Sequence, residues 1–286
     1  MTLSEYLHKY HQSSTVKIYL FEIKHYLKWM GQHQAERAGH ADVLRYVAHL
    51  REHYTSGTIY RIVHAIKRYY YYLQAIEKRL DHPCRLLQLK DVKRSQIQTQ
   101  DLLTPKELKQ LLNREERFPS YGLRNKLILS LLVYQGLLTK EICGIKTGDI
   151  NLEKGQIYIR ETVKTNARTL PLQAKQIMLI YRYLREYRAR FIKQETEALI
   201  ISGRGQAEQG EGIHYLVTTM RELISGKKLT PMTIRQSVIT NKLKAGQDLR
   251  VVQVFAGHRK PSSTEVYRTN NLEELRTAVA KYHPLK

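Results

Sequence analysis

Residues 230–267 read TPMTIRQSVITNKLKAGQDLRVVQVFAGHRKPSSTEVY. Taken alone, each polar residue of this stretch has an ordinary explanation, because one tyrosine among 20 is usually a packing residue. Their order and spacing are more specific than their identities. The residues concerned are Arg235 in a helical pattern, the turn at 246–249, the pair Gly257-His258, and Thr264 before Tyr267. The stretch therefore indicates a constellation of arginine, histidine and tyrosine late in the chain.

This constellation resembles the C-terminal signature of the tyrosine recombinases, also called the phage integrase family. The run VKTNARTLPL, residues 163–172, resembles the family's β-hairpin, which carries a catalytic lysine, and Lys164 falls on that position. The run YQGLLTKEICGIKTGDINL, residues 134–152, resembles the first catalytic motif, in which Glu141 matches an acid that orients its neighbours. The resemblance covers nearly the whole chain.

The resemblance implies phosphodiester cleavage, and each implied residue suits its task. Tyr267 is the expected nucleophile, which forms a 3′-phosphotyrosyl bond that stores the energy for rejoining. Arg235 can make a forked contact with phosphate oxygens that lysine cannot copy. Lys164 is expected to protonate the leaving 5′ oxygen, and His258 to donate a hydrogen bond or assist the proton transfer. The family requires neither metal nor nucleotide, so we expect no cofactor and no metal site.

The chain departs from the family at two catalytic positions. Leu138 stands where the arginine of the first motif is expected, directly after a Gly-Leu pair. Met232 stands three residues before Arg235, where the family usually has histidine. Loss of one preorganised donor to the transition state typically costs about 100- to 1000-fold in rate. The change at Leu138 is the more serious, because the family tolerates other residues at the second position.

Three explanations are open for the missing arginine. In the first, a nearby cation replaces it, and the local candidates are Lys140, Arg160 and Arg168. Arg160 and Lys140 are preferred, since Arg168 also suits a structural or phosphate-binding role in the hairpin. In the second, the protein cleaves slowly or only in a full assembly. In the third, it no longer cleaves DNA. The retained tyrosine, lysine, second arginine and Gly-His pair favour some activity.

The charge of the chain favours a polyanionic partner. Its 286 residues carry 48 Lys and Arg against 26 Asp and Glu, a net charge of +22. Duplex DNA is the first candidate and an anionic membrane surface the second, but no run approaches the ~20 apolar residues of a membrane span. The first residues lack a signal-peptide core, so we expect a cytoplasmic, nucleoid-associated protein. The two cysteines, Cys84 and Cys143, indicate neither a disulfide framework nor a zinc site.

Hydrophobic periodicity predicts a mainly α (α+β) protein. Three helical segments fill residues 1–80 and resemble the family's helical core-binding, SAM-like DNA-binding domain. A basic stretch at 81–101 is interpreted as a linker, either solvated or crossing phosphates. Residues 102–286 form the expected catalytic domain, which opens on a helix-capping signal. The cations predicted to contact DNA are Arg61, Lys67, Arg68, Lys93 and Arg94.

The catalytic domain is expected to hold one small antiparallel sheet among helices. Strand-like runs occupy 155–160 and 167–172. Helices are expected at 173–192, 212–224, 231–245, 248–256, 262–268 and 271–282. In the first domain, Tyr69 to Tyr72 cannot all face one way on a helix, and a role of most of them in the core is preferred to a stacking platform.

The resemblance also implies partners. The family acts as a tetramer on two DNA duplexes, and its C-terminal helix packs into a neighbouring protomer, so the expected helix at 271–282 predicts a homo-oligomer contact. Packing on its own domain is the alternative. Two other function classes remain: a DNA-binding accessory protein, which Leu138 and Met232 favour, and a basic RNA-binding protein, for which no RNA-module signature appears.

Overall fold

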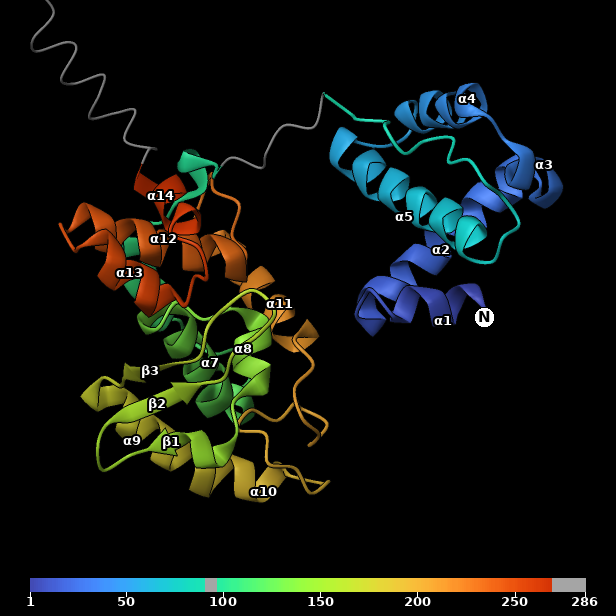
Figure 1. Ribbon diagram of the computed structural model, residues 1–286. Helices are drawn as coiled ribbons and strands as arrows, with labels where there is room; N and C mark the ends of the chain where they lie inside the picture. Colours follow the sequence, from blue (N-terminus) through green and yellow to red (C-terminus); the bar gives the residue numbers. More distant parts are fainter. Residues whose placement is uncertain (91–96, 269–286) are drawn as a thin grey trace, which may run out of the picture. The chain divides into compact units, whose positions relative to one another are not determined.

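The computed structural model describes residues 1–90 and 97–268, and the chain divides into two compact units, 1–96 and 97–286 (Figure 1). Both units are mainly helical, and the second also holds a three-stranded antiparallel sheet. The expected fold class, mainly α with one small antiparallel sheet, is confirmed.

The first unit packs its helices around a tyrosine-rich core. Its helices are α1 (Leu3–His8), α2 (Ser13–Met30), α3 (Gln32–Arg37), α4 (His40–Arg51) and α5 (Ser56–Ala75). Two short ones, α1 and α3, were not predicted, because six residues are too few to show a helical period. The hydroxyls of Tyr26 and Tyr70 lie 2.6 Å apart in the core, and Tyr70 also donates to the carbonyl of Ala35. Both buried phenols are therefore hydrogen-bonded.

The four consecutive tyrosines of α5 serve the core, as predicted. Tyr69 and Tyr70 are buried, and Tyr71 and Tyr72 pack partly buried against the same core. A helix carries successive side chains around its axis, so one run of four reaches both the centre of the core and its edge.

The chain beyond α5 continues on the first unit. Cys84 is fully buried in its core, and the ammonium of Lys67 donates to the carbonyls of Arg85 and Leu87, at 3.1 and 2.7 Å. The first part of the expected linker therefore packs on this unit. The domain limits at 80 and 101 stay predictions.

The second unit is built around α7 (Gly122–Tyr134), which is buried along most of its length. Residues 127–132 of this helix are all buried and, apart from Ser130, apolar, which suits the centre of a domain. Helices α6 (Pro105–Leu112), α9 (Ala174–Arg182) and α12 (Pro231–Lys244) pack against it. The other helical elements are the 3₁₀ segments Thr99–Asp101, Pro119–Tyr121, Thr147–Asp149 and Arg221–Leu223, the π-helical segment Tyr183–Arg188, and α8 (Thr139–Gly144), α10 (Ala189–Phe191), α11 (Glu211–Thr218), α13 (Leu249–Ala256) and α14 (Ser262–Arg268).

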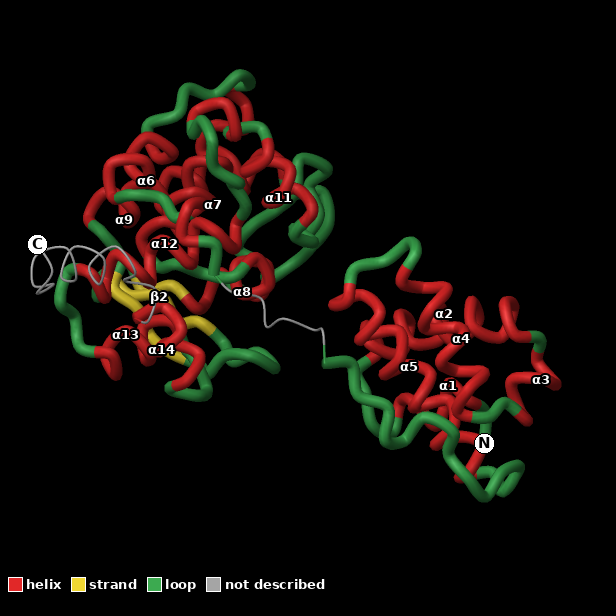
Figure 2. The backbone as a smooth tube through the Cα atoms, turned by 90° about the horizontal axis from the view of Figure 1, so that it is seen from above, coloured by secondary structure: helices red, strands yellow, loops and turns green. Residues whose placement is uncertain are grey.

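The small sheet turns an arginine toward the core. Its antiparallel strands, drawn in yellow in Figure 2, are β1 (Ile150–Asn151), β2 (Gln156–Ile159) and β3 (Arg168–Pro171). The last two lie within the predicted runs, whereas β1 is too short to show an alternation. Successive side chains of a strand point to opposite faces. Ile159 of β2 and Leu170 of β3 are buried, and Arg168 shares their face, paired in register with Ile159.

Local caps define the last helices. The hydroxyl of Thr230 accepts the amide hydrogen of Thr233 at 3.0 Å where α12 begins. The carboxylate of Asp248 caps α13, and Gly257 ends it with φ 70°, a left-handed conformation that suits glycine. These helices and α14 agree with the predicted ranges, whereas the expected helix at 271–282 lies outside the described residues.

Two expected helices differ in the structure. Within the range 173–192, α9 is followed by the π-helical segment and then by α10. Within the range 212–224, the α-helix α11 ends at Thr218. Hydrophobic periodicity does not distinguish these local changes of winding, because the buried face stays the same.

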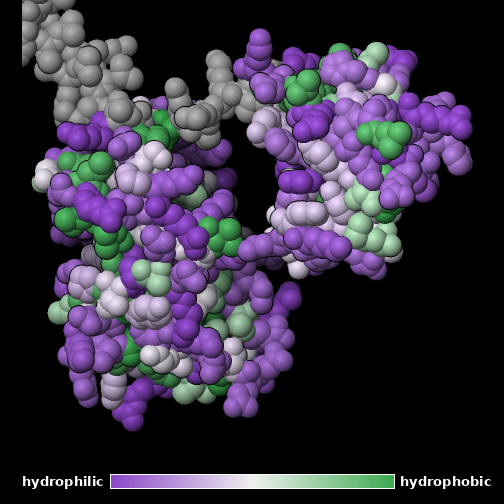
Figure 3. Space-filling model, in the orientation of Figure 1, coloured by the Kyte–Doolittle hydropathy of each residue, from purple (hydrophilic) through white to green (hydrophobic). Residues whose placement is uncertain are grey.

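Hydrophilic side chains cover most of the visible surface of both units (Figure 3). On α2, Lys17, Lys24 and Lys28 are exposed. Among the described residues, no helix combines the length and the apolar character needed to cross a membrane.

Candidate active site

A buried carboxylate is the centre of the candidate site. Glu141 lies in the first turn of α8, and its Oε2 accepts the amide hydrogen of Leu138 at 2.8 Å. An acidic residue at the third helical position commonly makes this contact. Its side chain is fully buried, so its charge requires partners in the protein.

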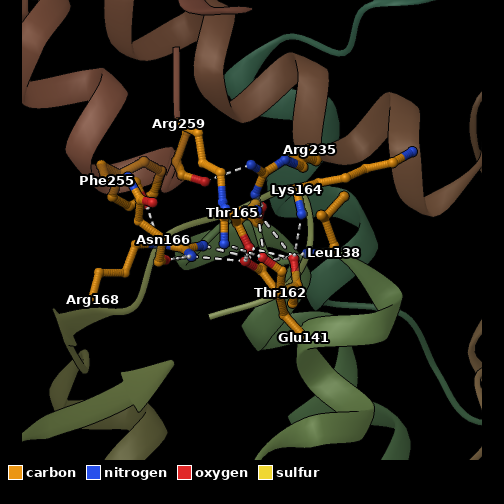
Figure 4. Close-up of polar contacts among 12 residues, drawn as sticks. Leu138, Glu141, Thr162, Lys164, Thr165, Asn166, Arg168, Arg235, Phe255 and Arg259 are labelled. Atoms are coloured by element: carbon orange, nitrogen blue, oxygen red, sulfur yellow. Dashed lines mark hydrogen bonds and ion pairs between the residues drawn. The ribbon is translucent and has the colours of Figure 1, made fainter. Parts of the chain in front are cut away.

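Two guanidinium groups supply those partners (Figure 4). Arg168 reaches Glu141 from β3 and donates to both carboxylate oxygens, at 2.7 and 3.2 Å. Arg235 comes from α12, and its Nη1 lies 3.7 Å from Oε2 of Glu141. The hydroxyl of Thr165 also donates to Glu141, at 2.8 Å. Burial acts to raise the pKa of Glu141, but these hydrogen bonds and charges outweigh it and hold that pKa below its ordinary value.

Backbone carbonyls also hold Arg235. Its Nη1 donates to the carbonyl of Gly136 and its Nη2 to that of Ala256, both at 2.6 Å. These carbonyls belong to the segment before α8 and to the end of α13, so the guanidinium joins segments far apart in the sequence. Burial lowers the pKa of Arg235 and the charge of Glu141 opposes that effect, but an arginine stays charged in a protein.

Two aromatic rings stack beside this cluster. The centroids of His258 and Tyr267 are 6.0 Å apart, and their planes differ by 16°. Nδ1 of His258 lies 2.8 Å from the hydroxyl of buried Thr264, which fixes the plane of the imidazole. Burial raises the pKa of Tyr267, with the charge of Arg235 acting in the other direction. The phenol is therefore protonated at neutral pH.

The turn between β2 and β3 carries Lys164 and is tied to the Gly-His pair. The amide of Asn166 donates to the carbonyl of Gly257 at 2.8 Å, and Thr165 pairs with His258 in an isolated β-bridge. The Lys164 side chain itself is exposed. The structure thus brings the five positions predicted as catalytic to one corner of the second unit: Tyr267, Arg235, His258, Lys164 and Glu141.

The two atypical residues supply no polar side chain to this corner. Leu138 is partly buried beside Glu141, and only its backbone amide contacts the carboxylate. Met232 is about half exposed at the start of α12. Neither side chain offers a charge or a hydrogen-bond donor that a phosphate could use.

The cations considered as replacements for the missing arginine differ in their surroundings. Arg160 is held by Asp149, with two guanidinium nitrogens 3.1 and 2.6 Å from the carboxylate oxygens. Lys140 is exposed on α8. Of the three, Arg168 is the one that contacts Glu141. The preference for Arg160 and Lys140 stays a prediction, and the structure adds that the pleat of β3 directs Arg168 inward to Glu141.

Three contributors to the site were not predicted as such. The inward alternation of Leu170 and Leu172 places Arg168 on the same face, and this signal could have found it. No comparable signal marks Thr165, because its partner Glu141 comes from another segment of the chain. Thr264 belongs to the motif before Tyr267, but the motif does not indicate its contact with His258.

Three of the five cations predicted to contact DNA have partners within the first unit. Arg61 pairs with a carboxylate of α2 at 3.0 Å, and Arg68 lies over two tyrosine rings, at 5.7 and 5.8 Å from their centroids. Lys67 donates to backbone carbonyls. Lys93 and Arg94 lie outside the described residues. Contact of these five residues with DNA stays a prediction.

Metal-type donors gather at one place in the described part of the chain, and this place belongs to the first unit. His49, Glu52 and His53, at the end of α4, each place one ligand atom within 4.8 Å of the others. The three side chains are open to solvent, and surface groups of this kind need no ion to explain them. The Arg235 cluster is rich in cations and therefore disfavours a metal ion.

Comparison with known proteins agrees with this geometry. The phage integrase family profile matches residues 101–274, and that of the phage integrase N-terminal SAM-like domain matches residues 3–77. The chain belongs to the phage integrase family. Members of this family are tyrosine recombinases, so the activity is DNA strand cleavage and rejoining through a tyrosine, as the sequence predicted.

Relatives of this recombinase match along most of their length. The tyrosine recombinase XerA of Thermococcus kodakarensis is 30% identical over 271 residues, which cover 93% of this chain and 88% of the relative. The structure of the XerH site-specific recombinase bound to its palindromic difH substrate has the same fold, with a TM-score of 0.75 at 17% identity, over 93% of this chain and 80% of that one. A lambda integrase tetramer bound to a Holliday junction gives a TM-score of 0.71 at 13% identity, over 93% and 74%.

His258 makes the stability of this recombinase depend on pH. Burial lowers the pKa of His258 from 6.5 to about 4, and the charges of Arg235 and Arg168 act in the same direction. Between these two pKa values His258 binds a proton in the unfolded chain but not in the folded chain. The stability that depends on a neutral His258 is therefore present above about pH 6.5 and is lost as the pH falls toward 4. Calorimetric unfolding temperatures measured down to about pH 4.5 should therefore fall less steeply for His258→Asn.

The matched control for this prediction is His33→Asn, which changes an exposed histidine of α3. It should keep the pH dependence of the native chain. Parallel profiles for the native chain and His258→Asn would show that His258 does not stay neutral in the folded protein.

Proposed function

We propose that this recombinase cleaves duplex DNA at specific sites with Tyr267 as its nucleophile and rejoins the strands to new partners. One observation carries the proposal: Tyr267 stacks on His258 beside the cluster of Arg235 and Glu141. Cleavage of a phosphodiester requires a nucleophile, cations for the charge on the non-bridging oxygens, and a proton for the leaving group. This corner of the second unit offers all three.

The proposed reaction exchanges one phosphoester bond for another. The oxygen of Tyr267 attacks the phosphorus and releases its proton to water, while the bond from phosphorus to the 5′ oxygen breaks. Because burial raises the pKa of Tyr267, the proton leaves during the attack rather than before it. Lys164 supplies a proton to the 5′ oxygen. The 3′-phosphotyrosyl product keeps the energy needed for rejoining, which is the reverse reaction with a new 5′ hydroxyl.

Each remaining residue acts on the phosphate directly or through a neighbour. Arg235 keeps N–H groups beyond its two carbonyl contacts, and these bind the non-bridging oxygens. Nδ1 of His258 lies 2.8 Å from the hydroxyl of Thr264. In the proposed tautomer this hydroxyl donates to Nδ1, and Nε2 carries the hydrogen that is donated to the phosphate. Glu141 is a positioning residue, because it holds the guanidinium groups without reaching the substrate.

We infer an active enzyme despite the residues at Leu138 and Met232. Buried charges are costly to a fold, and a buried carboxylate with two buried arginines is retained here. A protein that only binds DNA has no chemical need for this cluster together with Tyr267. The accessory role that the two departures favour is therefore the weaker hypothesis, and the experiment below distinguishes the two.

The proposed working unit is a homo-tetramer on two DNA duplexes, which exchanges strands in two steps through a four-way junction. The lambda integrase tetramer on a Holliday junction, which shares this fold, supports the assembly. In this proposal, the tail at 269–286, outside the described residues, contacts a neighbouring protomer. The exposed lysines of α2 support contact with duplex DNA in the nucleoid. Such binding weakens steeply with added salt, because neutralised phosphates release counterions.

The test is covalent capture on a nicked duplex. A target site is first selected by binding from a library of random-sequence duplexes, and a nick is then placed just 3′ of the cleavage point. The short fragment with the new 5′ hydroxyl dissociates, so rejoining stops and the adduct accumulates. We expect a protein–DNA adduct that survives denaturation in detergent. A duplex that is bound tightly but never captured, even with a partner recombinase added, contradicts the proposal and leaves an accessory DNA-binding protein.

A further inference from the structure

The cluster around Glu141 carries an excess of positive charge. Two buried guanidinium groups, those of Arg168 and Arg235, face one carboxylate, and the three side chains are at most 3% exposed. His258 adds no charge at neutral pH, because its pKa lies near 4. Among the described residues this leaves one uncompensated positive charge in a poorly solvated place. Such an excess favours the binding of an anion at the cluster.

Arg168 still has hydrogen-bonding capacity for that anion. Its Nε donates to the carbonyl of Phe255 at 2.7 Å, and its two terminal nitrogens donate to Glu141 and, at 3.4 Å, to the carbonyl of Asn166. These contacts use four of the five N–H groups of a guanidinium. The remaining one belongs to Nη2, whose contact with Glu141 is at 3.2 Å.

Gly257 makes room for this guanidinium. A Cβ at position 257 would lie 2.5 Å from Nη1 of Arg168, and the φ of Gly257 is also positive. The glycine next to His258 therefore allows Arg168 to reach the site in addition to forming the turn. The arginine and the Gly-His pair are parts of one arrangement, in which the Phe255 carbonyl fixes the guanidinium against the same turn.

The other nearby cations are less suited to the task. Arg160 is paired with Asp149, and Arg259 donates to the carbonyl of Thr162 at 2.9 Å with about half of its side chain exposed. Lys140 is exposed and offers an ammonium rather than a planar fork. Arg168 combines a buried guanidinium with direct contact to the carboxylate that also holds Arg235.

We propose that Arg168 is the second guanidinium that neutralises the scissile phosphate, in place of the arginine that is missing at Leu138. This inference rests on the proposed cleavage reaction and deepens it. Arg168 and Arg235 contact the same carboxylate, so both can share one phosphate beyond it (Figure 4). In this arrangement the second catalytic guanidinium comes from β3 instead of from the start of α8, so the site still has two guanidinium groups.

The decisive experiment compares a normal duplex with one that carries a methylphosphonate at the scissile position. The methyl group removes the charge that a guanidinium would neutralise. We expect Arg168→Ala to cleave the normal duplex on the order of 100- to 1000-fold more slowly than the native chain, measured as release of the 5′-hydroxyl fragment. On the methylphosphonate duplex the two chains should differ by less than about tenfold. Arg160→Ala is the matched control and should cleave like the native chain on both.

A second variant separates charge from folding. Arg168→Ala combined with Leu138→Arg returns a guanidinium to the family position, and we expect it to regain at least about tenfold of the lost rate on the normal duplex. Leu138→Arg alone should change the native rate little, because the charge is already present. Thermal unfolding of each chain shows whether it is folded.

Two outcomes would overturn the inference while the proposed function stands. One is a folded Arg168→Ala chain that is equally impaired on both duplexes, which indicates a purely structural arginine. The other is a large acceleration by Leu138→Arg alone without rescue of Arg168→Ala, which indicates that the family position was never replaced. A native chain that cleaves neither duplex overturns the proposed function and this inference together.

Discussion

A Tyr267→Phe chain should bind the selected duplex as tightly as the native chain and form no covalent adduct. Phenylalanine keeps the ring that stacks on His258 and removes only the hydroxyl, so the packing of α14 is retained. The reaction then lacks its nucleophile, and no other group in the proposed mechanism can form the phosphotyrosyl bond. Adduct on the nicked duplex, separated in a denaturing gel, measures the effect.

The matched control for this change is Tyr215→Phe, which alters an exposed tyrosine of the same unit. It should capture DNA at the native rate. An adduct that persists in Tyr267→Phe would assign the nucleophile to another residue, and the stacking of Tyr267 on His258 would then be a packing contact.

An Arg235→Ala chain should cleave on the order of 100- to 1000-fold more slowly, because one preorganised cation is removed from the transition state. Arg235→Lys should also be strongly impaired, since an ammonium keeps the charge but cannot contact two oxygens through a planar fork. Fragment release from the nicked duplex under single-turnover conditions measures the chemical step.

Arg221→Ala is the control for this second prediction, because that arginine is exposed in a 3₁₀ segment of the same unit. It should cleave normally. If folded Arg235→Lys cleaves within about tenfold of the native chain, the forked contact is not used, and Arg235 instead holds the carbonyls of Gly136 and Ala256 in place.

Long elements with strong periodic patterns were predictable from the sequence. The helices α2 and α5 show apolar residues at helical spacing, and α6 and α12 are marked by a Thr-Pro pair where they begin. The short elements α1, α3 and β1 were not predicted, because they are shorter than the window in which a period can be seen.

The catalytic corner was predictable as a set of residues and not as a geometry. The motif assigned Tyr267, Arg235 and His258 by spacing, and the structure brings them together. Which of the nearby cations contacts Glu141 depends on contacts between segments that are distant in the sequence. Asp149 pairs with Arg160, and Glu141 pairs with Arg168. Neither ion pair can be predicted from the positions of these residues in the sequence.

Alternation along β3 is the one sequence signal that could have identified Arg168. It indicated an inward arginine, and an inward arginine requires a buried partner. Combined with an acidic residue in the first catalytic motif, this reasoning leads to the ion pair with Glu141 that the structure contains. The residue that we propose as the replacement for the missing catalytic charge is thus marked by its burial rather than by the motif.

The central claim is that Tyr267 is the residue that becomes joined to DNA. The most direct measurement is mass spectrometry of the captured adduct after digestion with protease and nuclease, because it identifies which of the 20 tyrosines carries the phosphoryl group. We expect a single modified peptide that contains Tyr267 with a 3′-linked nucleotide remnant. A modified peptide from any other part of the chain would contradict this account.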